Sequence, residues 1–164
     1  MSGKLYICPT PIGNLEDMTY RTIRILNEVD LIAAEDTRHS IKLLNHFEIS
    51  KPLTSYHEHN KDSKGGYLIN KLLEGENIAL ISDAGMPGIS DPGEDIIKQA
   101  IEHNIDIEVL PGATASITAL VGSGLETAKF AFEGFLDRDK KLRRSRLEEI
   151  KEEDRTMIFY ESPH

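Results

Sequence analysis

The sequence has 164 residues, enough for one ordinary domain or for one domain and part of another. Hydrophobic residues make up 39% and charged residues 29%, which is the composition of a soluble globular protein. The formal net charge of −9 excludes nucleic-acid binding by an evenly basic surface, although a local basic patch stays possible. The single cysteine, Cys8, excludes an internal disulfide, and no apolar run approaches the ~20 residues of a membrane span. We therefore expect a cytoplasmic protein with no membrane segment.

Short apolar runs alternate with amphipathic stretches along the first part of the chain. The apolar runs predict strands at residues 4–8, 30–34, 53–56, 78–82 and 105–110. Helical faces are predicted at Thr22, Ile25, Leu26 and Val29, at Ile41 and Leu44, at Leu68, Ile69, Leu72 and Leu73, at Ile97, Ala100 and Ile101, and at Ile117, Leu120 and Val121. This alternation of strand, loop and helix predicts an α/β fold with an open, mostly parallel sheet and flanking helices.

The first two strands end in segments with turn and cap chemistry. Residues 9–14 (PTPIGN) form a turn-rich loop, and Asp17 or Thr19 is expected to cap the next helix. Residues 35–38 (EDTR) place three charges directly after the second buried strand. Asp36 or Thr37 can cap the following helix while Arg38 pairs with a carboxylate, and a role in a site can coexist with that cap.

Two histidines follow the third strand, at His57 and His59 in the sequence HEHN. They would share one face of an extended segment, and H-x-H can bind a metal. A third ligand is not evident, and the motif is not H-E-x-x-H. We therefore expect two solvated loop histidines and no metal.

The fourth strand leads into a glycine-rich loop, SDAGMPGISDPG, at residues 82–93. Ligands of open α/β sheets bind just beyond the carboxyl ends of the strands, so residues 83–89 are predicted to form a ligand site. The loop has two aspartates but no lysine or arginine, which suits an amine, a cationic centre or ribose hydroxyls better than a phosphate. Asp91 is expected to be the N-cap of the next helix, with Pro92 at its first position and Glu94 at its third.

The pattern changes after Gly124, which is expected to end the fifth helix. Strands are predicted at 130–135 and 155–162, around a charged run at 137–146 with six basic residues. The last strand has few visible partners, so we expect the chain to be the N-terminal part of a longer protein. The predicted domains are residues 1–115, an α/β domain with the ligand loops, and residues 116–164, a linking helix and the incomplete start of a second α/β domain.

Seven segments of the chain occur in an order that is typical of a known family. They are YICPTPIGNLEDMT (6–19), AAEDTR (33–38), HEHN (57–60), SDAGMPGISDPG (82–93), PG (111–112), EGFL (133–136) and FYES (159–162). On these segments the whole chain resembles the tetrapyrrole methylase superfamily and, within it, the methyltransferases of small-subunit ribosomal RNA.

The resemblance implies S-adenosylmethionine-dependent 2′-O-methylation of a cytidine ribose in the decoding region of small-subunit (16S) ribosomal RNA. It also implies a homodimer, and a cofactor cleft between two α/β domains of which the second begins near the end of this chain. The 164 residues alone are therefore expected to be inactive. The implied cofactor contacts are Pro11, Ile12, Asp83, Ala84, Gly85, Met86, Pro87, Ile89, Thr114, Ala115 and Ser116, with Tyr160 from the second domain.

Methyl transfer to a ribose hydroxyl needs a group that accepts the hydroxyl proton, and Glu35, Asp36, His57 and His59 lie near strand ends. We predict His57 or His59 as the base. Asp36 and Arg38 are predicted to organise the substrate, because the Arg38 charge lowers the pKa of the Asp36 carboxyl. The dense basic run is predicted to contact RNA phosphates through Lys140, Lys141, Arg143, Arg144 and Arg146.

Two other functions are compatible with the same residues. One is a small-molecule, tetrapyrrole-type methyltransferase of the same fold, which would show no salt-dependent RNA affinity. The other is a non-catalytic nucleoside-binding or dimerisation module. Binding of S-adenosylmethionine, followed by transfer of labelled methyl to ribosomal RNA, separates the three.

Overall fold

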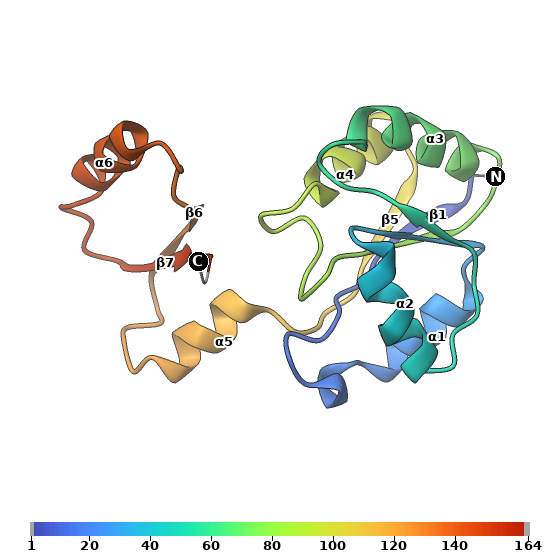
Figure 1. Ribbon diagram of the computed structural model, residues 1–164, viewed down its shortest axis with the longest axis horizontal. Coiled ribbons are helices and arrows are strands. Elements are labelled where there is room, and N and C mark those ends of the chain that lie inside the picture. Colours follow the sequence, from blue (N-terminus) through green and yellow to red (C-terminus); the bar gives the residue numbers. More distant parts are fainter. Residues whose placement is uncertain (1, 163–164) are drawn as a thin grey trace. The chain divides into compact units, whose positions relative to one another are not determined.

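A computed structural model describes residues 2–162 and divides the chain into two compact units, Met1–Thr114 and Ala115–His164. The first unit contains a five-stranded sheet in the order β3-β2-β4-β1-β5 (Figure 1). Its strands are β1 (Lys4–Ile7), β2 (Leu31–Ala34), β3 (Leu53–Ser55), β4 (Ile78–Ile81) and β5 (Asp106–Val109). Every pair of neighbours is parallel, which confirms the predicted α/β class. All five carboxyl ends therefore lie at one edge of the sheet.

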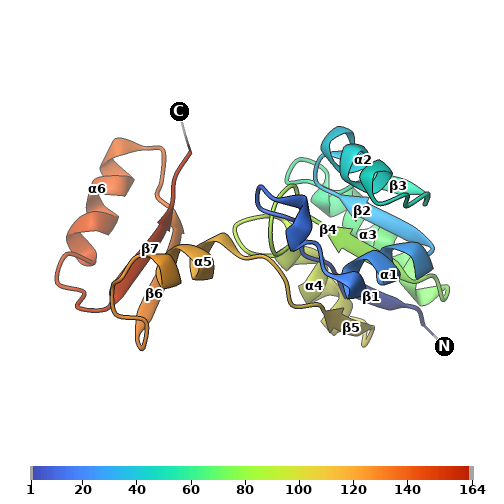
Figure 2. The same cartoon turned by 90° about the horizontal axis from the view of Figure 1, so that it is seen from below.

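Helices cover both faces of this sheet (Figure 2). They are α1 (Tyr20–Glu28), α2 (Thr37–His46), α3 (Lys61–Leu73) and α4 (Gly93–Glu102), and a short 3₁₀ helix, η1 (Leu15–Asp17), precedes α1. Leu26 of α1 and Leu44 of α2 pack into one core cluster, whereas Leu72 of α3 and Ile96 of α4 pack into the other. Strands β2 and β4 are buried along their whole length, as central strands of a two-sided parallel sheet must be.

Side-chain caps fix where α1 and α2 begin. The Thr19 hydroxyl accepts a hydrogen bond from the Thr22 amide at 3.0 Å, which confirms the predicted cap of α1. Asp36 is the N-cap of α2, and its carboxylate accepts a hydrogen bond from the Arg38 amide at 2.8 Å. These caps satisfy amides that have no partner within the helix.

Three details of the predicted helices are wrong. The N-cap of α4 is Pro92 rather than Asp91, so the helix begins one residue later than predicted. The predicted core residues Ile41, Leu73 and Ile101 are exposed, Ile101 by 62%. In α4 the buried residues are Ile96 and Ala100, which lie four positions apart on one face, so the helix is rotated by one residue from the predicted face.

The second unit contains α5 (Ala115–Gly122), β6 (Phe130–Phe135), α6 (Lys140–Glu149) and β7 (Thr156–Tyr160). Strands β6 and β7 pair in parallel, and the rings of Phe132 and Phe135 pack edge-on against Tyr160. Leu120 of α5 is buried as predicted, but Ile117 and Val121 are exposed by 45% and 71%. None of the helices within residues 2–162 is long and apolar enough to cross a membrane.

Candidate functional site

Three strand-end loops of the first unit are bound tightly to one another. Thr10 and Gly85 form an isolated antiparallel bridge, with both N···O distances at 3.0 Å. Gly85 has a φ of +84°, and a Cβ added there would lie 3.2 Å from Ile12 Cγ2. A Cβ on Gly112 would lie 2.4 Å from Pro9 Cγ, so the loops after β1 and β5 approach more closely than any other residue permits.

The loop after β4 is fixed by the carboxylate of Asp91. Its Oδ1 accepts hydrogen bonds from the Gly88 amide at 2.7 Å and from the Gly93 amide at 2.8 Å. Burial raises the pKa of Asp91, and the two amides oppose that shift. Gly88 and Ser90 both have positive φ values, of 86° and 64°. Asp91 therefore holds the loop closed onto the start of α4, which is a structural task close to the predicted cap.

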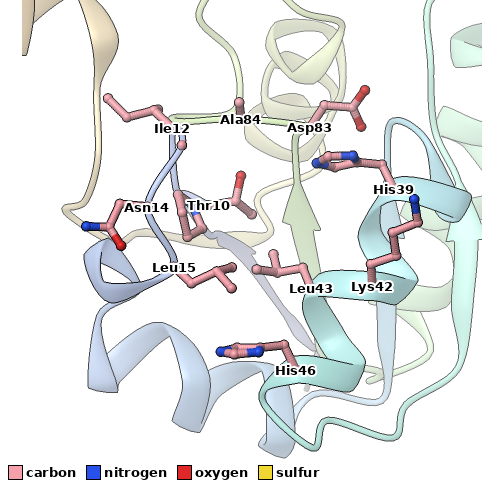
Figure 3. Close-up of a pocket in the computed structure, with 12 residues that line it drawn as sticks. Thr10, Ile12, Asn14, Leu15, His39, Lys42, Leu43, His46, Asp83 and Ala84 are labelled. Carbon is pink, nitrogen blue, oxygen red and sulfur yellow. The ribbon is translucent and has the colours of Figure 1, made fainter.

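A hollow of the first unit opens beside these loops, against helix α2 (Figure 3). We call it the α2 cavity; its volume is about 630 Å³. It is lined by Thr10, Pro11, Ile12, Gly13, Asn14, Leu15, His39, Lys42, Leu43, His46, Asp83 and Ala84. The structure thus brings four of the predicted cofactor contacts, Pro11, Ile12, Asp83 and Ala84, to one hollow.

The other predicted cofactor contacts of the first unit do not line the α2 cavity. Gly85 is buried behind the loop surface, and Met86 packs against the core cluster that contains Leu72 and Ile96. Pro87 is also buried, whereas Ile89 is exposed by 42%. The Thr114 hydroxyl donates a hydrogen bond to the Gly112 carbonyl at 3.3 Å.

A second hollow lies at the ends of β2 and β3, and we call it the histidine cavity. Its volume is about 430 Å³, and it is lined by Glu35, Asp36, Thr37, Arg38, Ser55, His57, His59 and Asp83. The structure therefore brings together all four predicted catalytic residues, although they come from two separate loops. Asp83 lines both cavities and accepts a hydrogen bond from the Asp36 amide at 3.1 Å.

The carboxylates around the histidine cavity have opposite electrostatic environments. The Arg38 guanidinium bonds to Asp36 at 2.9 Å and lowers the pKa of that carboxyl to about 2. Burial, followed by the charge of Asp83, raises the pKa of Glu35. Asp36 is thus a fixed anion at neutral pH, whereas Glu35 holds a proton more readily than an exposed glutamate does.

The two histidines are held by an asparagine in the same loop. Asn60 Oδ1 accepts a hydrogen bond from the His57 amide at 2.8 Å, and Asn60 Nδ2 donates to the Ser55 hydroxyl at 3.2 Å. The rings of His57 and His59 lie 6.0 Å apart between centroids. The Nδ1 atom of His57 is buried and has no hydrogen-bond partner within residues 2–162. A buried ring nitrogen without a partner is costly, which is typical of a position that a ligand completes.

The predicted site residues of the second unit also cluster. The Tyr160 hydroxyl accepts a hydrogen bond from the Ser116 amide at 3.3 Å. Ala115, Ser116 and Tyr160 line a hollow of about 380 Å³ within this unit, together with Phe135 and Ile158. The structure therefore brings Tyr160 to Ala115 and Ser116, which lie far from it in the sequence.

The predicted RNA-binding run forms the exposed helix α6, which Asp139 caps. The basic side chains of α6 are not equally available to a ligand, because some of them already have partners. Arg146 bonds to Glu133 at 2.8 Å and to Glu149 at 3.1 Å, and Arg143 Nε donates to the Asp137 carbonyl at 2.9 Å. Among the residues that the structure describes, Lys140, Lys141 and Arg144 make no ion pair.

The geometry defines an α/β protein with a ligand site at the carboxyl edge of a parallel sheet. The model of the family Tetrapyrrole (Corrin/Porphyrin) Methylases matches residues 4–164. The chain therefore belongs to the tetrapyrrole methylase family, as the sequence motifs predict.

Close relatives carry a more specific name, Ribosomal RNA small subunit methyltransferase I. The relatives from Halalkalibacterium halodurans, Bacillus subtilis and Escherichia coli O157:H7 are 59%, 54% and 52% identical to this chain, each over 99% of it. The chain spans only 56%, 56% and 57% of their respective lengths.

Solved structures share the fold at low sequence identity. Diphthine synthase matches 99% of this chain and 65% of its own, with a TM-score of 0.75 and 15% identity. Uroporphyrin-III-C-methyltransferase from Thermus thermophilus matches 82% of this chain and 61% of its own, with a TM-score of 0.61 and 22% identity. These likenesses support the fold.

S-adenosylmethionine is the cofactor of this family, and the residues at the sheet edge fit it. The loops at residues 9–14, 83–89 and 111–114 contain no lysine or arginine, and the Asp83 carboxylate lies at their edge. A positively charged sulfur and an amino group are favoured near such a carboxylate. The glycines of these loops let the loops pack closely on one another, because a Cβ on Gly85 would meet Ile12 and one on Gly112 would meet Pro9.

Several residues at the site escaped the sequence analysis. His39, Lys42 and His46 line the α2 cavity, and Asn60 holds the histidine loop. The spacing of three and seven residues along α2 was a usable signal, because such positions share one helical face. The role of Asn60 depends on contacts with Ser55 and His57 that no spacing rule reveals.

Proposed function

We propose that the chain is part of an S-adenosylmethionine-dependent methyltransferase that acts on the 2′-hydroxyl of a cytidine in the decoding region of small-subunit (16S) ribosomal RNA. The observation that carries the proposal is the identity of 52–59% with relatives named Ribosomal RNA small subunit methyltransferase I. The proposed enzyme works in the cytoplasm as a homodimer, and its substrate lies within the small ribosomal subunit.

The chain's own residues divide into binding and proton-transfer roles. When bound, S-adenosylmethionine supplies a methyl group on a positively charged sulfur. Pro11, Ile12 and the loop from Asp83 are proposed to hold it at the sheet edge, with Ala115, Ser116 and Tyr160 as contacts from the second unit. What the chain must add is the position of the substrate hydroxyl and an acceptor for its proton.

The histidine cavity provides candidates for the second task. His57 presents a buried nitrogen without a partner, and Glu35 has a raised pKa beside it. Asp36 is bound to Arg38 and stays ionised, so it is a poor proton acceptor and a better anchor for the substrate or for Arg38. We propose His57, with His59 as the second candidate, as the base.

The direct test is methyl transfer by a full-length protein that carries this chain. Calorimetry should detect S-adenosylmethionine binding, and labelled methyl should pass to small-subunit ribosomal RNA. The 164-residue chain alone should bind the cofactor weakly or not at all and should transfer no detectable methyl, because it spans just over half of its relatives. Methylation of a tetrapyrrole in place of RNA would contradict the proposed substrate. Equal turnover by the 164 residues alone would contradict the proposed need for the rest of the protein.

The basic helix α6 gives a separate prediction about RNA binding. Replacing Lys140 and Lys141 by glutamine should flatten the slope of log affinity against log salt by about one to two units, because each phosphate contact releases counterions. The replacement of Arg146 is the matched control, since this arginine is already paired with Glu133 and Glu149 and should matter less. An unchanged slope in the lysine variant would show that α6 is a solvated face only.

A further inference from the structure

Helix α2 differs in charge from the other helices of the first unit. Its ten residues, TRHSIKLLNH, contain Arg38, His39, Lys42 and His46 and no acidic residue. Helix α1 carries Glu28, α3 carries Asp62, and α4 carries Glu94, Asp95 and Glu102. A helix without carboxylates is unexpected in a chain whose net charge is −9. A local excess of positive charge on such a protein marks where an anion is favoured.

Three basic residues of α2 face one hollow. His39, Lys42 and His46 are spaced by three and four residues, so they lie on one side of the helix, and all three line the α2 cavity (Figure 3). Arg38 is bound to Asp36, but Lys42 makes no ion pair within residues 2–162. The α2 side of the cavity therefore carries one lysine, between two histidines, that is available to a ligand.

The opposite wall of the cavity is apolar. It is formed by Ile12 and Leu15, and Leu15 points across the cavity toward Leu43 of α2. Leu15 is exposed by 42%, although it lies in a short helix at the mouth of a binding loop. Leu15 and Leu43 beside Lys42 suit a ligand with one flat apolar part and one anionic part.

A nucleotide has this combination and carries no positive group. S-adenosylmethionine also has a base and one carboxylate, but its sulfonium and amino groups are positive, so Lys42 favours the phosphate of a nucleotide over the cofactor. A phosphate is favoured there, and an unstacked base can lie against leucine side chains. The volume of about 630 Å³ is within the usual range of small-ligand pockets, roughly 300–1,000 Å³.

We propose that the α2 cavity holds a nucleotide of the RNA substrate, with its phosphate at Lys42, His39 and His46 and its base between Leu15 and Leu43. The inference rests on the proposed function and adds one contact between the protein and the RNA substrate. Asp83 lines both the α2 cavity and the histidine cavity, so a nucleotide held at α2 lies next to the proposed reaction site. Helix α2 then positions one nucleotide while its neighbour reaches the histidines.

The test compares Lys42→Gln with Lys98→Gln in a full-length protein that carries this chain. Lys98 lies on α4, on the opposite face of the sheet, where it pairs with Glu94 in water. The probe is ribosomal RNA isolated from small subunits, and its affinity is measured at several salt concentrations. At about 0.1 M salt, Lys42→Gln should weaken binding by about 5- to 10-fold and should flatten the salt slope by about one unit. Lys98→Gln should change neither.

A second measurement separates this inference from the proposed function. The affinity of Lys42→Gln for S-adenosylmethionine, measured by calorimetry, should equal that of the unchanged protein. Equal RNA affinity and slope in Lys42→Gln and the unchanged protein would overturn the α2 contact and leave the proposed function intact. A loss of cofactor affinity in Lys42→Gln would show that Lys42 serves the cofactor rather than the RNA, which would also overturn the inference. Failure of the unchanged protein to bind the RNA at all would overturn the proposed function and this inference together.

Discussion

Gly85→Val should abolish S-adenosylmethionine binding while most of the fold is retained. Gly85 has a φ of +84°, which a β-branched residue adopts only under strain of about 1–3 kcal/mol. Its new Cβ would lie 3.2 Å from Ile12 Cγ2, and Ile12 cannot yield without disturbing the wall of the α2 cavity. The bridge between Thr10 and Gly85 joins the loops after β1 and β4, so both loops would shift. Calorimetry with a full-length protein that carries this chain measures the loss.

The matched control is Gly124→Val in the second unit. Gly124 also has a positive φ, of 73°, but a Cβ there meets nothing within 4 Å. The control therefore carries similar backbone strain without a clash in the binding loops. Circular dichroism should show that both variants fold, and only Gly85→Val should lose the cofactor. Unchanged affinity in Gly85→Val would show that this loop is not part of the cofactor site.

The sheet could be predicted from the sequence because its strands are clear apolar runs. β2 and β4 are buried at every position, so no polar residue interrupts their apolar runs. The loops after them contain glycine, proline and aspartate in combinations that strands and helices avoid. The position of the candidate site followed from the sheet, since parallel strands bring their carboxyl ends to one edge.

The exact helical faces could not be predicted, because adjacent apolar residues fit two rotations of a helix. In α4 the pair Ile96 and Ile97 allows either a face with Ala100 or a face with Ile101. The structure buries Ile96 and Ala100 and exposes Ile101, a choice made by packing against α3 and the sheet. The prediction of Asp91 as the N-cap of α4 failed because its carboxylate bonds to the Gly88 amide and closes the loop. Packing against distant residues decides the first case, and local hydrogen bonds decide the second.

The candidate acid–base residues were predicted from their positions near strand ends, but their electrostatics required the structure. The sequence indicated that Arg38 would keep Asp36 ionised, and the 2.9 Å contact accounts for a pKa of about 2. It gave no sign that Glu35, one residue earlier, would be half-buried beside Asp83 with its pKa raised. The difference arises because Arg38 bonds to Asp36 at the start of α2, whereas Glu35, directly after β2, is partly buried next to Asp83.

His57→Ala should reduce kcat by about 10²-fold or more in a full-length protein that carries this chain, with cofactor affinity kept. The buried Nδ1 of His57 has no partner in the described part of the chain, and it lies in a cavity with Glu35, Asp36 and Arg38. A ring nitrogen in this position can accept the hydroxyl proton of a substrate. His59→Ala tests the second candidate in the same cavity, and it should lower kcat less than His57→Ala does, because His59 is exposed.

The dependence of kcat on pH distinguishes the histidine from the buried carboxylate. Burial and Asp83 raise the pKa of Glu35, so this carboxyl is a stronger base than Asp36, whose pKa of about 2 leaves it ionised and weakly basic. If His57 is the base, Glu35→Gln should alter kcat less than His57→Ala does, and Asp36→Asn should raise KM more than it lowers kcat. If both histidine variants keep the full kcat from about pH 6 to 9 while Glu35→Gln loses it, the proton goes to Glu35, and His57 serves only to position the substrate.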